Sequence, residues 1–340
     1  MTKEEFNGFG PTLLREILEE EHEIKVSHEW MRQHMIAEGK WHPKKVKKQK
    51  SHPRRKRRSR KGELIQLDGS YEDWFENRGP RCCLLVMIDD ATSEIMAMRF
   101  VEHETTNDYF EILREYINRH KRPLALYSDR HSVFKASKKE ETKVKDIRYS
   151  QFERAMKELD IEMIHARSPQ AKGRVERANG TLQDRLIKKM RRQGIKTMEE
   201  GNNYLEEYRK EHNRKFAKQA EISEDAHVEL LPSMNLDRIL VIKEKRKVLK
   251  NQELQYGNKI YQLELKNKAR RMQGVDVDIL KKTNGRIIIE YQGQEIKYSV
   301  FEELAAKNTI MDHKQLEVLV ERKRPHTAIE RFRKGMACNF

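Results

Sequence analysis

This 340-residue sequence has few cysteines and no long apolar run, and each absence excludes a class of protein. Its three cysteines, Cys82, Cys83 and Cys338, are too few for a disulfide framework and do not form a pattern of zinc ligands. No apolar stretch approaches the roughly 20 residues that a bilayer-spanning helix needs. The charged N-terminus does not resemble a signal peptide. We therefore expect a cytoplasmic protein that keeps its thiols reduced and has no membrane partner.

Positive charge is present in excess. The formal net charge is +16, and 37% of the residues are charged. This balance favours an anionic polymer as partner, and nucleic acid is the first candidate. A basic protein without such a partner is the alternative. The hydrophobic content of 36% is sufficient for a core, which we expect to be divided among two or three domains.

Residues 1–42 predict two helices joined by a tight turn. Pro11 suits the first turn of one helix, and Ser27 is a suitable N-cap for a second helix that ends at Gly39. A helix-turn-helix of this kind would present Arg32 and Gln33 of its second helix to DNA. An ordinary helical hairpin is the alternative, but the basic stretch that follows favours DNA binding.

Residues 43–61 form a basic linker. Twelve of the 18 residues from 44 to 61 are Lys or Arg, and none is acidic. Such a run cannot collapse into a core, although a purely solvated linker would have the same composition. We interpret it as a linker that follows the DNA backbone and releases counterions there. The residues that we expect to contact phosphates are Arg54, Arg55, Arg57 and Arg58.

Residues 62–216 alternate between strand and helix patterns. The predicted strands are 63–68, 82–89, 95–100, 124–128 and 162–165, and the predicted helices are 106–120, 152–159, 172–192 and 198–213. Short turns join the first three strands, whereas helices connect the later ones. We therefore expect a ribonuclease-H-like fold, an α/β architecture with a mixed five-stranded sheet and flanking helices. A polar insert at 136–149 is predicted to be an exposed loop.

The C-terminal part predicts a second, smaller fold. After a connection at 217–240, six short strand patterns lie within residues 241–300, and Gly257-Asn258 and Asn284-Gly285 mark tight turns between them. We expect a small β-barrel there. Residues 301–340 are predicted to form a basic tail.

Three acids are the strongest candidates for catalysis. Asp68 ends one predicted strand, Asp129 directly follows another, and Glu176 lies on the helix that follows Ser168-Pro169. Carboxylates are the ligands that Mg²⁺ and Mn²⁺ prefer, and two such ions can activate a water or a 3′-hydroxyl and stabilise the leaving oxygen. Asp89 and Asp90 also follow an apolar strand. We interpret these two as structural, because a tight turn favours Asp for backbone hydrogen bonds.

Basic and polar residues surround Glu176. We expect Lys172, Arg174 and Arg177 to position phosphates. Asn179 shares the helix face of Glu176 and is a further candidate DNA contact. Gly180 shares that face too and costs about 1 kcal/mol relative to Ala within a helix. Close approach by DNA or by a neighbouring backbone would explain it.

Four segments carry a resemblance to a known family. They are Leu67-Asp68-Gly69-Ser70, Ile88-Asp89-Asp90-Ala91-Thr92, Tyr127-Ser128-Asp129 and the run from Ser168 to Arg177. These segments resemble the core of insertion-sequence transposases of the retroviral-integrase-like superfamily and are similar to the ISNCY group. The resemblance runs from Gly10 to Phe216. It implies an Asp-Asp-Glu triad of Asp68, Asp129 and Glu176, with two Mg²⁺ or Mn²⁺ ions per active site.

The resemblance also implies partners. These are double-stranded DNA, as terminal inverted repeats and as target, and further copies of the chain in a synaptic complex associated with a prokaryotic nucleoid. Two features depart from the family pattern. Asp129 and Glu176 lie 47 positions apart, more than is usual, and the insert at 136–149 accounts for the difference. Members of this group usually carry another helix-turn-helix upstream, so we expect a truncated copy or a late start site.

We interpret the chain as a DNA transposase that cleaves transposon ends and transfers the 3′-hydroxyl to target DNA. A catalytically silent DNA-binding regulator from a truncated element is one alternative, because the N-terminal segments would suffice for it. A ribonuclease-H-type nuclease acting on RNA–DNA hybrids is another, because it would have the same fold.

Overall fold

A computed structural model describes residues 6–43, 55–128, 150–165, 173–264 and 272–303. The chain divides into two compact units, residues 1–243 with 280–287 and residues 244–279 with 288–340. The expectations for Arg54, Asp129, Lys172 and the insert at 136–149 fall outside the described residues. Within the described ranges, no helix is long and apolar enough to cross a membrane.

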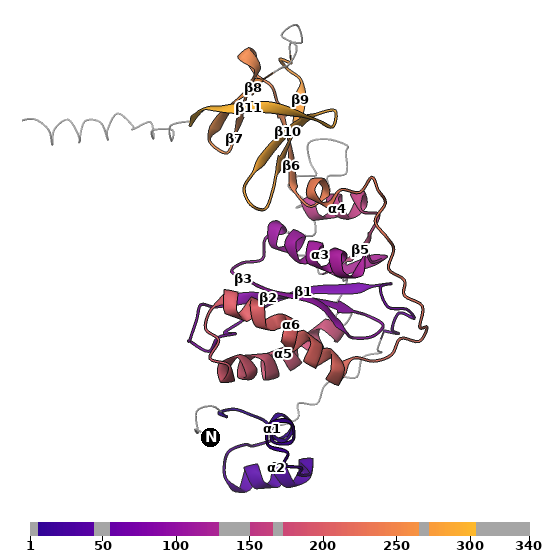
Figure 1. Ribbon diagram of the computed structural model, residues 1–340, viewed down its shortest axis with the longest axis vertical. Coiled ribbons are helices and arrows are strands. Elements are labelled where there is room, and N and C mark those ends of the chain that lie inside the picture. Colours follow the sequence, from indigo (N-terminus) through magenta and orange to yellow (C-terminus); the bar gives the residue numbers. More distant parts are fainter. Residues whose placement is uncertain (1–5, 44–54, 129–149, 166–172, 265–271, 304–340) are drawn as a thin grey trace, which may run out of the picture. The chain divides into compact units, whose positions relative to one another are not determined.

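A mixed sheet of five strands forms the centre of the first unit (Figure 1). The strands are β1 (Ile65–Glu72), β2 (Cys82–Asp89), β3 (Ile95–Val101), β4 (Ala125–Ser128) and β5 (Glu162–His165). Their order is β3-β2-β1-β4-β5, and β1, β2 and β3 are antiparallel, whereas β4 pairs in parallel with β1 and β5. This order and these directions confirm the expected ribonuclease-H-like fold.

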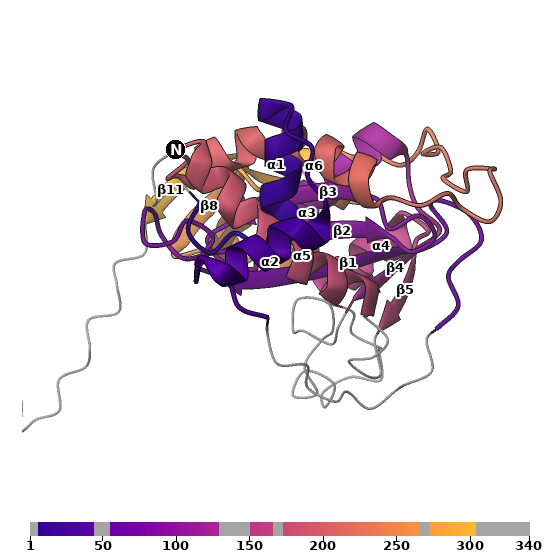
Figure 2. The same ribbon diagram turned by 90° about the horizontal axis from the view of Figure 1, so that it is seen from below.

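Helices cover both faces of this sheet (Figures 1 and 2). Helices α3 (Thr106–His120) and α4 (Gln151–Glu158) lie on one face, and α5 (Gly173–Arg192) and α6 (Met198–Phe216) lie on the other. All of β2 is buried between them, as its continuous apolar run predicted. Because side chains alternate along a strand, Cys83 joins the core under α3 and α4 and Cys82 joins the core under α5 and α6.

Two asparagines of α6 protect the edge of the sheet at β3. The side-chain amide of Asn202 accepts a hydrogen bond from the N–H of Phe100 over 2.7 Å and donates one to its carbonyl oxygen over 3.1 Å. Asn213 makes the same two bonds to Ile95, over 2.8 and 2.9 Å. An edge strand otherwise presents unpaired backbone groups that can recruit another strand. These amides therefore replace a sixth strand at two positions.

Two helices precede the sheet, α1 (Pro11–His22) and α2 (His28–Ala37). Pro11 begins α1 and the Ser27 hydroxyl caps α2 by accepting a hydrogen bond from Trp30 N–H over 3.1 Å, as the sequence predicted. Glu16 of α1 forms an ion pair with Arg185 of α5 over 2.6 Å. Burial raises the pKa of Glu16, but hydrogen bonds from Arg185 and Lys215 outweigh that effect and lower it to about 2.

After the short helix α7 (Leu236–Ile239), a second sheet of six strands follows. These are β6 (Ile242–Lys247), β7 (Glu253–Tyr256), β8 (Lys259–Glu264), β9 (Asp276–Lys281), β10 (Ile287–Tyr291) and β11 (Gln294–Glu303), with a 3₁₀ turn at Lys250–Gln252. The order β6-β9-β10-β11-β8-β7 is barrel-like, as expected. Gly257 and Asn258 have φ of 56° and 60° and make the tight turn between β7 and β8. β11 continues to Glu303, three residues past the boundary expected from sequence.

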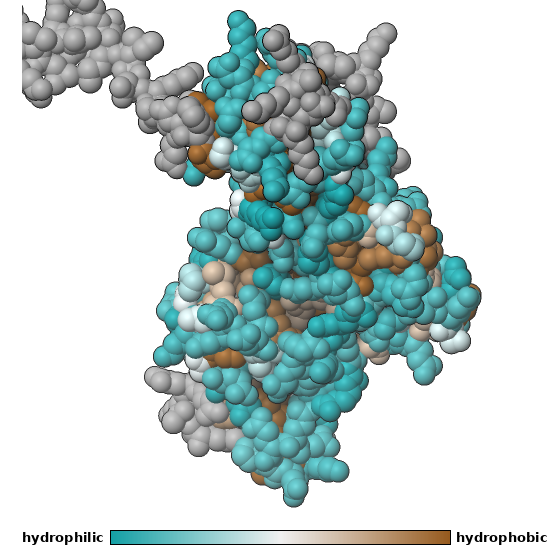
Figure 3. All heavy atoms as spheres, turned by 45° about the horizontal axis from the view of Figure 1, so that its top comes forward, coloured by the Kyte–Doolittle hydropathy of each residue, from teal (hydrophilic) through white to brown (hydrophobic). Residues whose placement is uncertain are grey.

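The surface follows the composition of the chain. The face shown in Figure 3 is mostly hydrophilic, with separate apolar patches between the polar side chains. This distribution agrees with a charged fraction of 37%. Large apolar side chains are nevertheless exposed at single positions, among them Trp30 at 52% and Tyr71 at 54%. Isolated exposures of this kind are normal on protein surfaces.

Candidate active site

One face of β1 carries polar side chains although it lies inside the protein. Ile65 and Leu67 point into the core under α3 and α4. Gln66, Asp68 and Ser70 alternate with them and therefore point toward α5. Gln66 is fully buried, Ser70 is nearly so, and Asp68 is half-buried. Polar groups in such a place need partners, because an unpaired buried group costs roughly 1–3 kcal/mol.

Each of these side chains has its partner on α5. Two residues along a strand advance about 6.6 Å and four residues along a helix about 6.0 Å, so successive pairs stay in register. The pairs, which we call the β1–α5 ladder, are Val175 N–H to Gln66 Oε1 at 3.2 Å, Asn179 Nδ2 to Asp68 Oδ2 at 3.0 Å, and Gln183 Nε2 to Ser70 Oγ at 3.1 Å. The ladder fixes α5 along β1.

Asp68 lies in the middle of β1, and the expectation that it ends a strand was wrong. β1 continues to Glu72 because it pairs with β2 along its whole length. On its other side, β4 pairs only with Ile65 and Gln66 and ends at Ser128. Asp68 therefore lies two residues beyond the last pair with its parallel neighbour. Asp68 thus lies just past the end of the parallel pairing of β1 with β4, although β1 itself continues.

Glu176 lies in the first turn of α5 and is exposed. It directly follows Val175, which is buried and belongs to the ladder, so the backbone at Glu176 is held close to β1. An acid in this turn is also favoured by the helix dipole. Within the described residues, which include Glu176 and Asp68 but not Asp129, no three His, Cys, Asp or Glu side chains are grouped so that they could hold a metal ion.

The oxygen atoms beside Asp68 suit a hard divalent cation. Asn179 is only 7% exposed, and its Oδ1 is buried without a hydrogen-bond partner among the residues that the structure describes. Its Nδ2 meanwhile holds one oxygen of the Asp68 carboxylate. Carboxylate and amide oxygens are ligands that Mg²⁺ and Mn²⁺ prefer. The donor atoms at this point therefore fit such an ion or the water that it binds.

The acids that end β2 are fully buried. Asp89 makes the turn hydrogen bond that its position predicted, because it accepts from the N–H of Thr92 over 2.7 Å. It also accepts from the N–H of Gly62, outside the turn, over 2.8 Å. Burial raises the pKa of Asp89, because the charged form is poorly solvated there.

Asp90 has a different set of partners, which sequence reasoning missed. Its Oδ1 accepts from Gln66 Nε2 over 2.7 Å, from Arg174 over 2.8 Å and from the Arg55 guanidinium. Its Oδ2 accepts from the N–H of Arg58 over 2.9 Å. One buried carboxylate thus joins the linker, β1 and the first turn of α5. The sequence did offer one signal for such partners, namely an acid at the end of a buried strand in a strongly basic chain.

The expected DNA contacts in the linker and on α5 fall into two groups. Arg55, Arg174 and Asn179 have the intramolecular partners described above. Arg57 belongs with them, because its guanidinium donates to the carbonyl oxygens of residues 90 and 91 over 3.2 and 3.0 Å and to a serine hydroxyl over 2.9 Å. The side chains of Arg58 and Arg177 are exposed.

The expected DNA contacts on α2 are bonded to each other through Glu29. The Glu29 carboxylate accepts two hydrogen bonds from the guanidinium of Arg32, over 2.6 and 2.8 Å, and one from Gln33 over 3.0 Å. Hydrogen bonding by Arg32 lowers the pKa of Glu29 to about 2. These exposed groups can exchange one partner for another at little cost, because surface ion pairs contribute little to stability.

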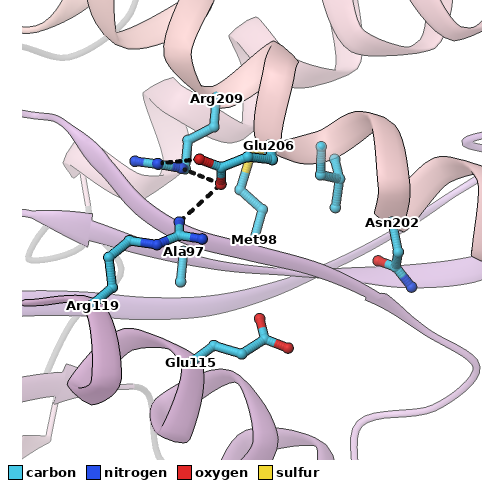
Figure 4. A pocket seen from close by; sticks show the side chains of 8 residues that line it. Ala97, Met98, Glu115, Arg119, Asn202, Glu206 and Arg209 are labelled. Carbon is cyan, nitrogen blue, oxygen red and sulfur yellow. Dashed lines mark hydrogen bonds and ion pairs between the residues drawn. The ribbon is translucent and has the colours of Figure 1, made fainter.

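A pocket of about 120 Å³ lies at the edge strand β3, between α3 and α6 (Figure 4). Glu206 pairs there with Arg119 over 2.9 Å and with Arg209 over 2.8 Å. The lining residues are Ala97, Met98, Glu115, Arg119, Asn202, Leu205, Glu206 and Arg209. None of the residues predicted to act in catalysis or DNA binding is among them.

The sequence matches two curated relatives. It is 41% identical over 303 residues to the "Putative transposase y4bF" of Sinorhizobium fredii, a match that covers 89% of this chain and 66% of that protein. It is 32% identical over 272 residues to the "Transposase for insertion sequence IS1202" of Streptococcus pneumoniae, over 80% of this chain and 55% of that protein. Both relatives are named transposases, and the chain is similar to them over most of its own length. It spans between about half and two thirds of the length of these transposases, and no family model matches it.

Solved structures give weaker likenesses to this sequence. The HTLV-2 integrase catalytic core domain in complex with magnesium (dimeric form) is 18% identical with a TM-score of 0.33, over 43% of this chain and 85% of that one. A chain of the simian T-cell lymphotropic virus intasome in complex with PP2A regulatory subunit B56 gamma is 14% identical with a TM-score of 0.39, over 88% and 100%. Likenesses of this strength say nothing about the site.

Proposed function

We propose that the chain is a DNA transposase that cleaves phosphodiesters at transposon ends and joins the freed 3′-hydroxyl to target DNA. The observation that carries this proposal is the β1–α5 ladder. It holds the turn that bears Glu176 against the strand that bears Asp68. The two curated relatives, both named transposases, support the same class of reaction.

The pairing of β1 with β4 supports Asp129 as the third acid. Ile65 pairs with Leu126, and Gln66 pairs with Tyr127. The difference in residue number between Asp68 and Asp129 is the same as the difference within each of these two pairs. Asp129 also follows directly on the last residue of β4. The sheet therefore provides neighbouring strands for the two aspartates of the proposed triad.

In the proposed site, the carboxylates of Asp68, Asp129 and Glu176 would hold two Mg²⁺ or Mn²⁺ ions. When bound, such ions lower the pKa of a water or 3′-hydroxyl and stabilise the leaving oxygen. Asn179 restricts the orientation of the Asp68 carboxylate by holding one of its oxygens. Strand and helix supply a rigid frame, and such preorganisation reduces the cost of aligning the reacting groups.

The proposed substrates are the terminal inverted repeats and target DNA, and the proposed assembly is a multimeric synaptic complex. The exposed Arg58 and Arg177 would contact phosphates, and Lys172 and Arg54 are candidates on the same segments. Arg32 and Gln33 of α2 would reach the major groove after exchanging Glu29 for DNA. Binding of this kind weakens steeply with salt.

The test uses the full chain and terminal DNA identified from the sequence that flanks its gene. Asp68→Asn and Glu176→Gln should abolish Mg²⁺- or Mn²⁺-dependent cleavage and strand transfer while DNA binding is retained. Asp184→Asn is the matched control, because Asp184 is an exposed acid on the same helix that pairs only with Lys188 within the described contacts. Full activity of Asp68→Asn would refute the assignment. Cleavage of an RNA–DNA hybrid but not of transposon ends would favour a ribonuclease-H-type nuclease.

A further inference from the structure

A buried carboxylate outside the proposed triad joins the basic linker to the catalytic helix. Asp90 is fully buried, and a buried charge is tolerated only when it is paired and hydrogen-bonded. Two guanidinium groups, one amide and one backbone N–H meet this need. A buried carboxylate requires about this many partners. Burial does not require, however, that the partners come from three separate parts of the chain.

The partners of Asp90 lead directly to Glu176. Arg174 lies in the first turn of α5, two residues before Glu176, and also donates to the carbonyl oxygen of Arg55 over 3.0 Å, so the linker backbone contacts α5 directly. Gln66 donates to Asp90 with its Nε2 and accepts from Val175 N–H with its Oε1. The first N–H groups of a helix have no partner within the helix, so such bonds hold its first turn. The linker therefore contributes to the position of this turn.

Neighbouring basic residues of the linker differ in this respect. The Arg55 side chain is 33% exposed and reaches Asp90. The Lys56 side chain is 83% exposed, and its ion pair with Glu221, at 3.6 Å, is on the surface. Both residues carry one positive charge, and both were expected to lie in a segment that follows the DNA backbone. Only Arg55 has a partner that also contacts the catalytic helix.

We propose that Asp90 couples the basic linker to the Glu176 turn of α5, with Arg55 as a positioning residue. This inference rests on the proposed function, because Glu176 is assigned its role there. Loss of the Arg55 guanidinium removes one cation from Asp90 and releases the segment whose carbonyl holds Arg174. The first turn of α5 then opens more often, and Glu176 is held less firmly. Lys56 contributes to DNA affinity alone.

The first experiment measures order in α5 without any need for activity. Hydrogen–deuterium exchange is followed in peptides covering residues 173–180 of the full chain, for Arg55→Gln, Asp90→Asn and the control Lys56→Gln. We expect exchange in Arg55→Gln to rise about tenfold, as loss of one charge-assisted bond allows. Lys56→Gln should leave exchange unchanged and reduce the salt slope of binding to a duplex oligonucleotide by about 0.9. Unchanged exchange in Arg55→Gln, with or without an effect in Asp90→Asn, would overturn the proposal.

The second experiment measures cleavage of terminal DNA at saturating concentration. Arg55→Gln should lower the saturated rate, whereas Lys56→Gln should recover the full rate once enough DNA is added. Equal behaviour of the two variants would overturn the coupling. Activity of Glu176→Gln separates the two ideas. If Glu176→Gln is inactive and Arg55→Gln cleaves at the full rate, only the coupling is refuted. If Glu176→Gln is active, the proposed function is refuted, and the coupling is then tested by hydrogen–deuterium exchange alone.

Discussion

The side-chain amide of Asn179 on α5 donates a hydrogen bond to the carboxylate of Asp68 on β1 over 3.0 Å. This bond is the central pair of the β1–α5 ladder, between the Gln66 pair and the Ser70 pair. Glu176 lies three residues before Asn179 on the same helix. A single polar pair thus relates the two proposed catalytic acids that the structure describes. Catalysis and stability should both depend on it.

Replacement of Asn179 by Ala should lower both quantities. The change leaves a half-buried carboxylate without one of its donors, which should cost about 1–3 kcal/mol in free energy of unfolding. Metal-dependent cleavage should fall further than this loss alone predicts, because Asp68 is no longer oriented. Gln183→Ala is the control, since it removes an amide of the same helix that donates to Ser70 and Glu72 rather than to Asp68. Urea denaturation and cleavage assays that show equal losses for both variants would contradict a special role of Asn179.

Two glycines should respond to alanine in opposite directions. A Cβ at Gly180 would meet nothing within 4 Å, so Gly180→Ala should raise the free energy of unfolding by about 1 kcal/mol through helix propensity. A Cβ at Gly79 would lie 2.0 Å from the carbonyl oxygen of Lys196, so Gly79→Ala should destabilise strongly. Among the described residues, no neighbouring backbone explains Gly180. A stabilised Gly180→Ala that loses DNA binding would therefore support close approach by DNA, whereas a destabilised one would contradict the geometry.

The edge of the sheet gives a prediction about association. Asn202→Ala and Asn213→Ala each remove two bonds to backbone groups of β3. Each should cost roughly 1–2 kcal/mol and leave an edge that can pair with another chain. Thermal unfolding and light scattering would measure the two effects. Asn203→Ala is the control, since Asn203 is exposed on the same helix and should change neither.

Local patterns were sufficient for most of the strands and helices. The apolar run of β2 and the amphipathic pattern of α3 have the predicted bounds, because burial and periodicity determine them within one segment. The end of β1 was missed. Its extension past Asp68 depends on pairing with β2, and the polar residues Ser70 and Glu72 give no local signal for a strand.

The partners of the charged residues could not be predicted from the sequence. The chain has 71 Lys and Arg residues, and nothing local distinguishes Arg55 and Arg174, which reach the buried Asp90, from the exposed Lys56. Asn179 was predicted as a DNA contact, but its hydrogen bond to Asp68 was not predicted. Such pairs join residues far apart in sequence. They depend on the register between β1 and α5, which only the folded sheet determines.

The stability of the fold should depend on pH through a buried histidine. His212 is 4% exposed on α6, beside the ring of Phe216. Burial, and then the nearby Arg185, lower its pKa from 6.5 to about 4. The unfolded chain therefore binds this proton at a higher pH than the folded one. The resulting stability is complete above pH 6.5 and is lost as the pH falls toward 4, by up to about 3 kcal/mol.

His212→Phe should reduce the loss of unfolding free energy that urea denaturation measures between these pH values. Part of the loss should remain in this variant, because burial also lowers the pKa of His120 to about 4. The exposed His103→Phe should change nothing, and an unaltered pH dependence in His212→Phe would show that His212 is not the group responsible.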